Sequence, residues 1–359
     1  MCNIWKLQEK KPELATNELS TQNYIDLLKE LSEMGTKSIC LSGGEPLLRE
    51  DALDIISCAK RENLQVVMIT NGTLMTQTIA EELVNSGLDI ISFSIDGPTA
   101  EIHERHRRVK GSWKRAITGI KFINLAKKKF NVEKPTISIH YTLSRISYGY
   151  IDKMIDLRSE LGYDSLNFFP IIAKVPEVER LFLTDSDLSD LETRLDFLGT
   201  KFRNVGLPIS QISPLVRICR DREGTKKGRY AESLNKRVLC FAPWKMATVD
   251  PFGTVYPCCY ACTFQNLAGD LEHSFWGTVD FSMGNIRTES FNQIWSGDKY
   301  RQFRAKCKEL PSLPFCAWCD YGFLENAILT GLFKDRSLLF RIMLSVIRYR
   351  LGKSNGFEL

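Results

Sequence analysis

The sequence predicts an α/β fold, in which helices cover a parallel β-sheet, followed by a smaller cysteine-rich α+β unit. Three observations support this prediction. Short apolar runs alternate with segments of helical periodicity through the first half of the chain, these runs are largely continuous, and most of the 11 cysteines fall in the last third. Continuous apolar strands are typical of a sheet buried on both faces, and strand–helix alternation is typical of parallel strands.

The individual strands and helices follow from these patterns in order. Ser20 or Thr21 can cap a first helix that ends at Gly35. Further helices are expected from about residue 50, up to residue 87, around 113–123 and near 149–161. Five segments are predicted as strands: 38–43, 65–70, 90–95, 136–142 and 165–170. Such sheets close as barrels or lie open, and in both cases ligands bind at the carboxyl ends of the strands.

Small or polar residues follow three successive predicted strands at this end. They are Gly43, Gly44, Glu45, Asn71, Ser94 and Asp96. Each one alone is explained by a strand-to-helix turn, which favours the same residue types. Together they indicate one shared pocket. Glycines let a backbone approach a ligand closely, and a carboxylate such as Glu45 can hold an ammonium group. The set suits a ligand that has an amino-acid end and a ribose.

The composition is that of an ordinary globular protein. The chain has 359 residues, 43% of them hydrophobic and 25% charged, with a net charge of +5. Outside a basic tail the charge is nearly balanced, so nucleic acid is not an expected partner. No apolar run reaches the roughly 18 residues of a membrane span, and lysines near the start exclude a signal peptide. We therefore expect a cytoplasmic protein, in which clustered cysteines indicate metal or redox chemistry.

The cysteines divide into two groups. Cys40 and Cys58 lie within apolar runs and are expected to be buried. In the last third, Cys240 and Cys258 bracket a predicted hairpin, DPFGTVYPCC, that turns at Gly253. A close pair, Cys316 and Cys319, follows about 57 residues later. Four thiolates in two pairs predict a metal centre, either an iron–sulfur cluster or a structural zinc ion.

The order Cys2, GGEP, TNG, SIDGP and a following histidine resembles radical S-adenosylmethionine (SAM) enzymes across residues 2–172. The resemblance implies a partial (β/α)6 TIM-like barrel missing its first strand. In that family a Cys-x3-Cys-x2-Cys loop holds a [4Fe–4S] cluster that binds SAM and cleaves it to a 5′-deoxyadenosyl radical. Cys2 matches the third cysteine of the loop. We therefore expect that translation starts upstream of Met1, and a truncated gene is the alternative.

The resemblance also assigns roles to the residues of the predicted pocket. Gly43, Gly44 and Glu45 would hold the amino group of SAM, while Asn71, Ser94 and Asp96 would line the rest of the cofactor. Arg107 or Arg108 would meet its carboxylate, because arginine favours bidentate carboxylate pairing. A basic, solvated helix is the competing account of HERHRRVK. No catalytic acid or base is assigned.

The last third resembles the SPASM/twitch domain of the same family through ATVDPFGTVYPCC, MGNIRTESF and CAWCDYG. The resemblance implies one auxiliary [4Fe–4S] cluster on Cys240, Cys258, Cys316 and Cys319. Cys262 is the reserve ligand, and no role is assigned to Cys259 or Cys307. The expected domains are a barrel (1–175), a helical connector (176–235), the cluster domain (236–323) and a basic amphipathic tail (324–359). The tail could cover the barrel, bind a partner or contact a membrane surface.

These expectations lead to an enzyme hypothesis and two alternatives. The enzyme would abstract hydrogen from a small-molecule or peptide substrate, with an electron donor such as flavodoxin or ferredoxin. The first alternative is a truncated, non-catalytic iron–sulfur or SAM-binding protein that keeps only the auxiliary cluster. The second is a zinc-stabilised interaction module.

Overall fold

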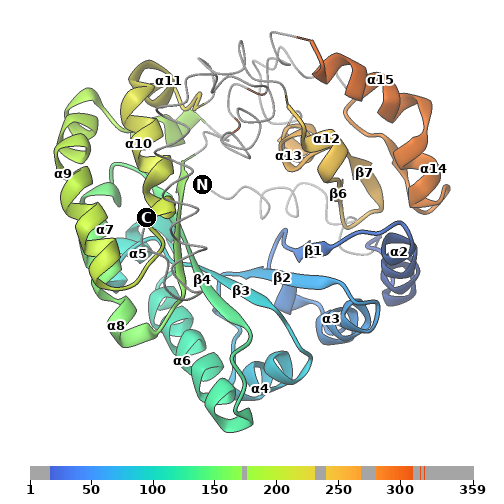
Figure 1. Cartoon of the computed structure of the whole chain (residues 1–359), viewed down its shortest axis with the longest axis horizontal. Coiled ribbons are helices and arrows are strands. Elements are labelled where there is room, and N and C mark those ends of the chain that lie inside the picture. Colours follow the sequence, from blue (N-terminus) through green and yellow to red (C-terminus); the bar gives the residue numbers. More distant parts are fainter. Residues whose placement is uncertain are drawn as a thin grey trace, which may run out of the picture.

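The computed structural model describes residues 17–171, 176–230, 240–267 and 280–309, together with Cys316 and Cys319. A five-stranded parallel sheet with the order β1-β2-β3-β4-β5 runs through the first half (Figure 1). Its strands are β1 (Ser38–Leu41), β2 (Gln65–Thr70), β3 (Ile90–Ser94), β4 (Thr136–Leu143) and β5 (Ser165–Pro170). All five predicted strands are therefore confirmed to within two residues at each end.

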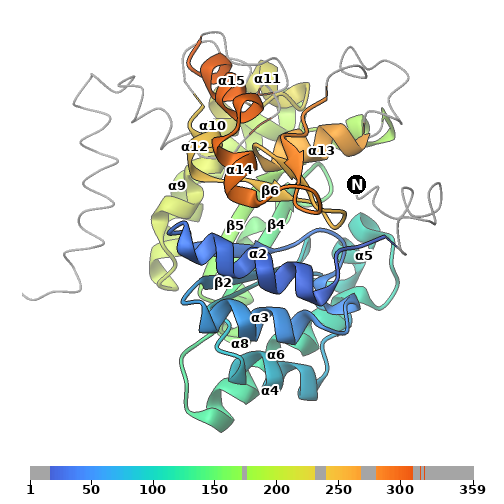
Figure 2. The same ribbon diagram turned by 90° about the vertical axis from the view of Figure 1, so that its right-hand side faces the viewer.

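The first described helix precedes β1, the others connect consecutive strands, and all lie along the outside of the sheet (Figures 1 and 2). They are α2 (Thr21–Glu33), α3 (Ala52–Arg61), α4 (Gln77–Asn85), α5 (Ala100–Arg107), α6 (Ser112–Phe130), α7 (Ile151–Asp156) and α8 (Arg158–Leu161). Short 3-10 helices precede α3 and α7, namely η2 (Pro46–Leu48) and η3 (Tyr148–Tyr150). The predicted cap of the first helix is confirmed, because Ser20 and Asn23 form a capping box at the start of α2.

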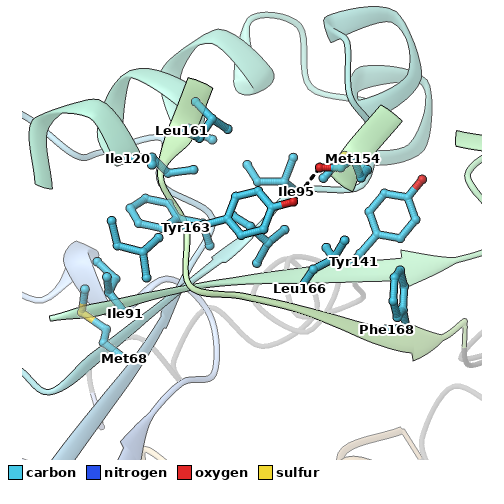
Figure 3. Close-up of a cluster of buried hydrophobic side chains, with 14 of the residues drawn as sticks. Met68, Ile91, Ile95, Ile120, Tyr141, Met154, Leu161, Tyr163, Leu166 and Phe168 are labelled. Atoms are coloured by element: carbon cyan, nitrogen blue, oxygen red, sulfur yellow. Dashed lines mark hydrogen bonds between the residues drawn. The ribbon is translucent and has the colours of Figure 1, made fainter. Parts of the chain in front are cut away.

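The two faces of the sheet differ in chemistry. The helix-covered face carries the apolar core, including Phe93, Tyr141 and Phe168. Figure 3 shows part of this core, where the buried hydroxyl of Tyr163 donates to the carbonyl oxygen of Met154 at 2.6 Å. Because strand side chains alternate between faces, the opposite face receives a different set of residues. That set includes several polar side chains, namely Ser92, Ser94, Ser138, His140, Ser165 and Asn167.

The segment predicted as a connector packs into the same core as the sheet. It contains η4 (Pro176–Leu181), α9 (Asp185–Asn204), η5 (Ile209–Ile212), α10 (Ser213–Arg220) and α11 (Arg222–Lys226). Leu198 and Phe202 of α9 and Leu215 of α10 are buried in the core cluster of the sheet. The side-chain oxygen of Gln211 accepts from the backbone N–H of Leu166 at 3.0 Å. This segment therefore covers the β5 side of the sheet, and the domain boundaries remain predictions.

A second, smaller sheet lies in the C-terminal part of the described chain. It has the order β6-β7-β8, with antiparallel neighbours β6 (Thr248–Val249), β7 (Thr254–Tyr256) and β8 (Gly284–Asn285). Around it lie α12 (Ala242–Lys245), α13 (Cys259–Leu267), α14 (Phe291–Ser296) and α15 (Asp298–Cys307). The predicted hairpin is confirmed: Gly253 has a φ of +89° between β6 and β7, in the left-handed region that favours glycine.

Helix α2 joins this small unit to the large sheet (Figure 2). Leu27 of α2 belongs to an apolar cluster with Val255, Phe291 and other residues of the C-terminal unit. The carboxylate of Glu30 accepts from the backbone N–H groups of Phe291 at 2.9 Å and Asn292 at 2.8 Å. These donors are the first N–H groups of α14, which have no partner within their own helix. The first helix described therefore caps a helix near the other end of the chain.

One predicted burial is wrong and several expectations fall outside the described residues. Cys58 is buried as expected, but Cys40 is exposed. Among the described strands β1 is at the edge of the sheet, and Cys40 alternates with Ile39 and Leu41, which pack on the core. Cys2 and the tail 324–359 lie outside the described residues. Within the described ranges, no helix is long and apolar enough to cross a membrane.

Candidate functional site

The glycine pair after β1 faces open space, and Glu45 closes the loop that follows it. No described atom lies within 4 Å of a Cβ built on Gly43 or Gly44, so a ligand can reach the backbone there. Glu45 is 9% exposed. Its carboxylate accepts from the Thr70 hydroxyl at 2.6 Å and from the backbone N–H of Asn71 at 2.7 Å. These bonds tie the β1 loop to the end of β2 and leave the carboxylate with further lone pairs for a ligand.

Asn71 closes a turn at the end of β2. Its side-chain oxygen accepts from both the backbone N–H and the hydroxyl of Thr73, at 2.8 and 2.5 Å. This is the turn geometry that asparagine favours, and it uses the carbonyl half of the side chain. The structure thus brings Asn71 next to Glu45, with the amide nitrogen as the part of the side chain available for a donor role.

Asp96 is completely buried behind Arg107. One carboxylate oxygen accepts from the backbone N–H of Thr142 at 2.9 Å, and the other faces Nδ1 of His106 at 3.2 Å and Nε of Arg107. Burial alone would raise the pKa of Asp96, but Arg107 and His106 hold that pKa well below its usual range. The Arg107 side chain is 26% exposed. The Asp96 carboxylate thus pairs with Arg107 and faces His106 inside the protein, and it fixes the position of the Arg107 side chain.

A series of buried polar side chains runs from Asp96 to the serines that follow β4. The sequence did not predict these contacts. Nε2 of His106 lies 2.9 Å from the Ser144 hydroxyl, which lies 3.2 Å from the Ser147 hydroxyl. Ser147 in turn donates to the carbonyl oxygen of Thr142 at 2.6 Å. In the sequence His106 sits in a run of charged residues that is typical of a solvated helix. No local signal distinguishes it, because its burial depends on the contact between α5 and the end of β4.

Two further histidines lie near these buried polar side chains. The backbone N–H of Asp96 donates to Nδ1 of His103 at 3.1 Å. His140 pairs in register with Ser94, and its ring lies 4.6 Å from the Phe169 ring. Burial lowers the pKa of both histidines to about 4. Both imidazoles are therefore neutral at pH 7, and His140 lies beside half-buried Ser94 on the polar face of the sheet.

The predicted pocket residues thus form two groups. The first joins Glu45 to Asn71, and the second joins Asp96 to Arg107. Among the described residues, no hydrogen bond joins one group directly to the other. One group presents a carboxylate, which can hold an ammonium, and the other presents a guanidinium, which can pair with a carboxylate.

The cysteine-rich region gathers around a small apolar cluster. Tyr256, Tyr260, Ala261 and Phe281 form its buried part, and the partly buried cysteines around them are Cys258, Cys259, Cys262, Cys316 and Cys319. Burial raises the pKa of the thiols of Cys240, Cys258 and Cys316. The backbone N–H of Cys319 donates to the carbonyl oxygen of Cys316 at 3.1 Å, so the predicted close pair forms a tight turn.

The cysteines in this region offer the thiolate ligands that either an iron–sulfur cluster or a structural zinc ion takes. Among the described residues, no group of three or more histidines, cysteines and carboxylates converges closely enough to hold one metal ion. A four-iron cluster holds each thiolate on a different iron and therefore spaces the sulfur atoms farther apart. The partly buried thiols match its preference for cysteine ligands.

Comparison with known proteins identifies both regions. The radical SAM superfamily profile matches residues 1–158, and the profile of the SPASM iron–sulfur cluster-binding domain matches residues 240–320. The AdoMet-dependent heme synthase of Methanosarcina barkeri is 28% identical over 85% of this chain and 80% of its own length. A mycofactocin maturase of Mycobacterium tuberculosis is 27% identical over 88% of this chain and 73% of its own.

The fold is also found among solved structures. The structure of native anSMEcpe with bound AdoMet and the Cp18Cys peptide has a TM-score of 0.55 at 18% identity, and the match covers 85% of this chain and 80% of that one. At this identity the match supports the fold alone. It agrees with the arrangement seen here, in which a parallel sheet is followed by a small antiparallel sheet.

Proposed function

The chain belongs to the radical SAM superfamily and carries a C-terminal SPASM iron–sulfur domain, and we propose that it cleaves SAM reductively to a 5′-deoxyadenosyl radical. This radical would abstract hydrogen from a small-molecule or peptide substrate. One relative is a heme synthase, and a structure of similar fold contains a bound peptide, so both substrate classes stay in the proposal.

The observation that carries the proposal is a pair of fixed opposite charges, one on Glu45 in the loop after β1 and one on Arg107 at the end of α5. Glu45 is fixed by Thr70 and the backbone of Asn71, and Arg107 is fixed by the buried carboxylate of Asp96. Both charged groups are held by bonds within the protein before any ligand arrives. Such preorganisation lowers the entropy that binding must overcome.

Each residue of the site then has a defined task. Glu45 accepts from the ammonium group of SAM, beside the open backbone of Gly43 and Gly44. Arg107 pairs with the carboxylate, and Asn71 and Ser94 bind the ribose. The [4Fe–4S] cluster of the family, when bound, would supply the electron that breaks a carbon–sulfur bond of SAM. Cys2, which the resemblance assigns to that cluster, lies outside the described residues.

The SPASM domain would hold one auxiliary [4Fe–4S] cluster that assists the reaction. By the resemblance, Cys240, Cys258, Cys316 and Cys319 would be its four ligands. An electron donor such as flavodoxin or ferredoxin would supply reducing equivalents. The apolar cluster around Tyr256 and Phe281 limits solvent near these thiols, and solvent exposure is one determinant of cluster potential.

The test combines metal analysis with product analysis on the full chain. The 359-residue chain and a form extended upstream of Met1 are both reconstituted anaerobically with iron and sulfide, and iron, sulfide and zinc are measured per chain. Each is then incubated with dithionite and SAM, and 5′-deoxyadenosine is quantified. We expect about four iron atoms for each cubane, together with formation of 5′-deoxyadenosine. Iron without any 5′-deoxyadenosine would favour the non-catalytic alternative, and zinc in place of iron would refute the cluster.

A matched pair of variants locates the SAM site. Glu45→Gln removes the charge that faces the ammonium group, and we expect SAM to bind at least about tenfold more weakly, since one charge-assisted hydrogen bond is worth about 1.5–3 kcal/mol. Glu50→Gln makes the same change at an exposed position five residues along the chain and should leave the dissociation constant unchanged. Calorimetric titration measures both. Equal affinities for the two variants would remove Glu45 from the site.

A further inference from the structure

We propose that the connection between α5 and α6 is the docking surface for an acidic electron-transfer protein that reduces this enzyme. The inference rests on the proposed function, because that function needs an electron donor. Five basic side chains define the surface, which we call the basic turn: Arg105, Arg108, Lys110, Lys114 and Arg115.

The basic turn carries positive charge that is not neutralised by ion pairs within the described chain. No aspartate or glutamate occurs between residues 105 and 132. All five side chains of the basic turn are exposed, and none of them forms an ion pair with a residue that the structure describes. Arg107, in the same stretch, differs because it pairs with buried Asp96. Neighbouring cations within about 8 Å reinforce one another at physiological ionic strength, so this surface attracts anionic partners.

The backbone beneath these cations is held at both ends. Arg108 ends α5 with a φ of +59°, and its N–H donates to the carbonyl oxygen of Glu104 at 2.7 Å. Nε1 of Trp113, at the start of α6, donates to the carbonyl oxygen of Gly97 at 3.1 Å. A surface that is ordered before binding loses less conformational entropy when a partner docks. The basic turn is therefore preorganised for a partner.

Two of the cations lie where helix electrostatics favours acidic residues. Lys114 and Arg115 belong to the first turn of α6, near the positive end of the helix dipole. No acidic residue occupies that turn, and Gly111 at the N-cap offers no capping side chain. Nη1 of Arg115 lies 3.5 Å from the place that a Cβ on Gly111 would take, so the guanidinium lies over the connection. Positive charge is thus kept here against the local stability of the helix, which is typical of a functional surface.

A cavity beside the basic turn offers a place for an acidic side chain of the partner. Its volume is about 240 Å³. Five of the residues that line it carry a cation or a hydroxyl group, namely Lys114, Arg115, Thr73, Thr76 and Thr118. Ammonium, guanidinium and hydroxyl groups all donate hydrogen bonds that a carboxylate accepts. Val109, which is 49% exposed between two of the cations, adds an apolar contact.

The position of the basic turn favours an electron donor over other acidic partners. Arg107 directly precedes Arg108, is held by Asp96 and is the residue proposed to pair with the SAM carboxylate. By the resemblance, the cluster binds SAM, so an electron must arrive near this part of the site. Electron-transfer complexes have small interfaces, and complementary charges steer their formation. Five cations around one exposed valine match an interface of this kind.

The decisive experiment titrates the full chain with a purified flavodoxin, an acidic one-electron donor, by calorimetry at low and high salt. Lys110→Glu combined with Lys114→Glu reverses two charges of the basic turn. Lys127→Glu combined with Lys128→Glu is the matched control, because it makes the same change near the other end of α6, about 20 Å away. We expect the first pair to weaken binding at least about fivefold and the control pair less than about twofold, since local charge complementarity governs docking. Wild-type affinity should fall with added salt.

A neutral pair of variants keeps the test independent of charge repulsion and of folding. Lys110→Gln combined with Lys114→Gln should weaken flavodoxin binding less than the glutamate pair and more than the control pair. Equal affinities in all variants, equal weakening by the two glutamate pairs, or no binding by the wild type at low salt would each overturn the inference. Binding to phosphatidylserine vesicles that depends on the basic turn, with flavodoxin binding independent of it, would overturn it as well.

Dithionite separates this inference from the proposed function. It is a small reductant that needs no docking surface, so 5′-deoxyadenosine formation with dithionite should be the same in the wild type and in the glutamate pair of the basic turn. Formation with reduced flavodoxin should fall in that pair and not in the control pair. Absence of 5′-deoxyadenosine from the wild type with dithionite would refute the proposed function, whereas the flavodoxin titration alone decides the docking surface.

Discussion

Replacing Asp96 by asparagine should destabilise the protein more than any other conservative change of a carboxylate described here. The substitution keeps the shape of the side chain and an oxygen for the backbone N–H of Thr142. It removes the charge that pairs with Arg107 and faces His106. Breaking a buried ion pair from one side costs about 3–5 kcal/mol. Because Arg107 is 26% exposed and water can solvate its free side, we expect the lower end of that range.

The loss of folding stability caused by Asp96→Asn should depend on pH in a defined direction. The pKa of Asp96 is held well below its usual range in the folded protein, against the opposing effect of burial. A carboxyl with a lowered pKa stabilises the fold above its unfolded pKa, which is about 3.9 for aspartate. That stabilisation is lost as the pH falls toward the folded pKa. The difference between wild type and Asp96→Asn should therefore be complete from pH 5 upward and should narrow below about pH 4.

Thermal and denaturant unfolding at several pH values measure this difference. A loss of about 3 kcal/mol corresponds to a fall in melting temperature of about 6–12 °C for domains of 150–250 residues. Asp164→Asn is the matched control: its carboxylate also accepts from a β4 backbone N–H, that of Ile137 at 2.8 Å, but it is exposed. We expect that control to cost less than about 1 kcal/mol. Equal losses in both variants, or a difference that grows on acidification, would refute the reasoning.

Three further substitutions test contacts that hold the site and the domains in place. His106→Leu leaves the Ser144 hydroxyl without its imidazole partner, and we expect a loss of about 1–3 kcal/mol in denaturant unfolding, with partial recovery in His106→Gln. Glu30→Ala removes the carboxylate that accepts from the first N–H groups of α14 and should cost about 1–2 kcal/mol by the same measurement. Arg304→Leu removes the guanidinium between two aromatic rings, and we expect a lower melting temperature and faster loss of iron to a chelator than in Arg301→Leu, an exposed residue of the same helix.

Sequence patterns predicted the parts of the fold that local physics determines. The five strands are marked by continuous apolar runs, and the hairpin at Gly253 is marked by a glycine whose φ is positive. The start of α2 is marked by the side chain of Ser20, which caps it. Each of these signals lies within the element that it specifies, so no knowledge of distant residues is needed.

Contacts between distant segments account for what the sequence did not reveal. Cys40 sits in an apolar run but is exposed, because exposure at the edge of a sheet depends on strand order. His106 sits in a charged run but is buried, because α5 packs on the end of β4. Asp96 follows β3 as predicted, and the structure adds that its carboxylate pairs with Arg107 of α5. In each case the neighbour that decides the role of the residue comes from another element.

Helix α2 supplies contacts that the C-terminal unit does not contain within itself, so that unit cannot simply be moved to another protein. Leu27 belongs to the apolar cluster of that unit, and Glu30 bonds to residues that follow it by more than 260 positions. A fragment that starts at residue 240 would lack Leu27 from its apolar core and the Glu30 carboxylate that caps α14. Transplanting the unit into another barrel would therefore require grafting the outer face of α2 with it. During synthesis, α2 is made early. Its Leu27 cannot pack against this apolar cluster until α14 and α15 have been made.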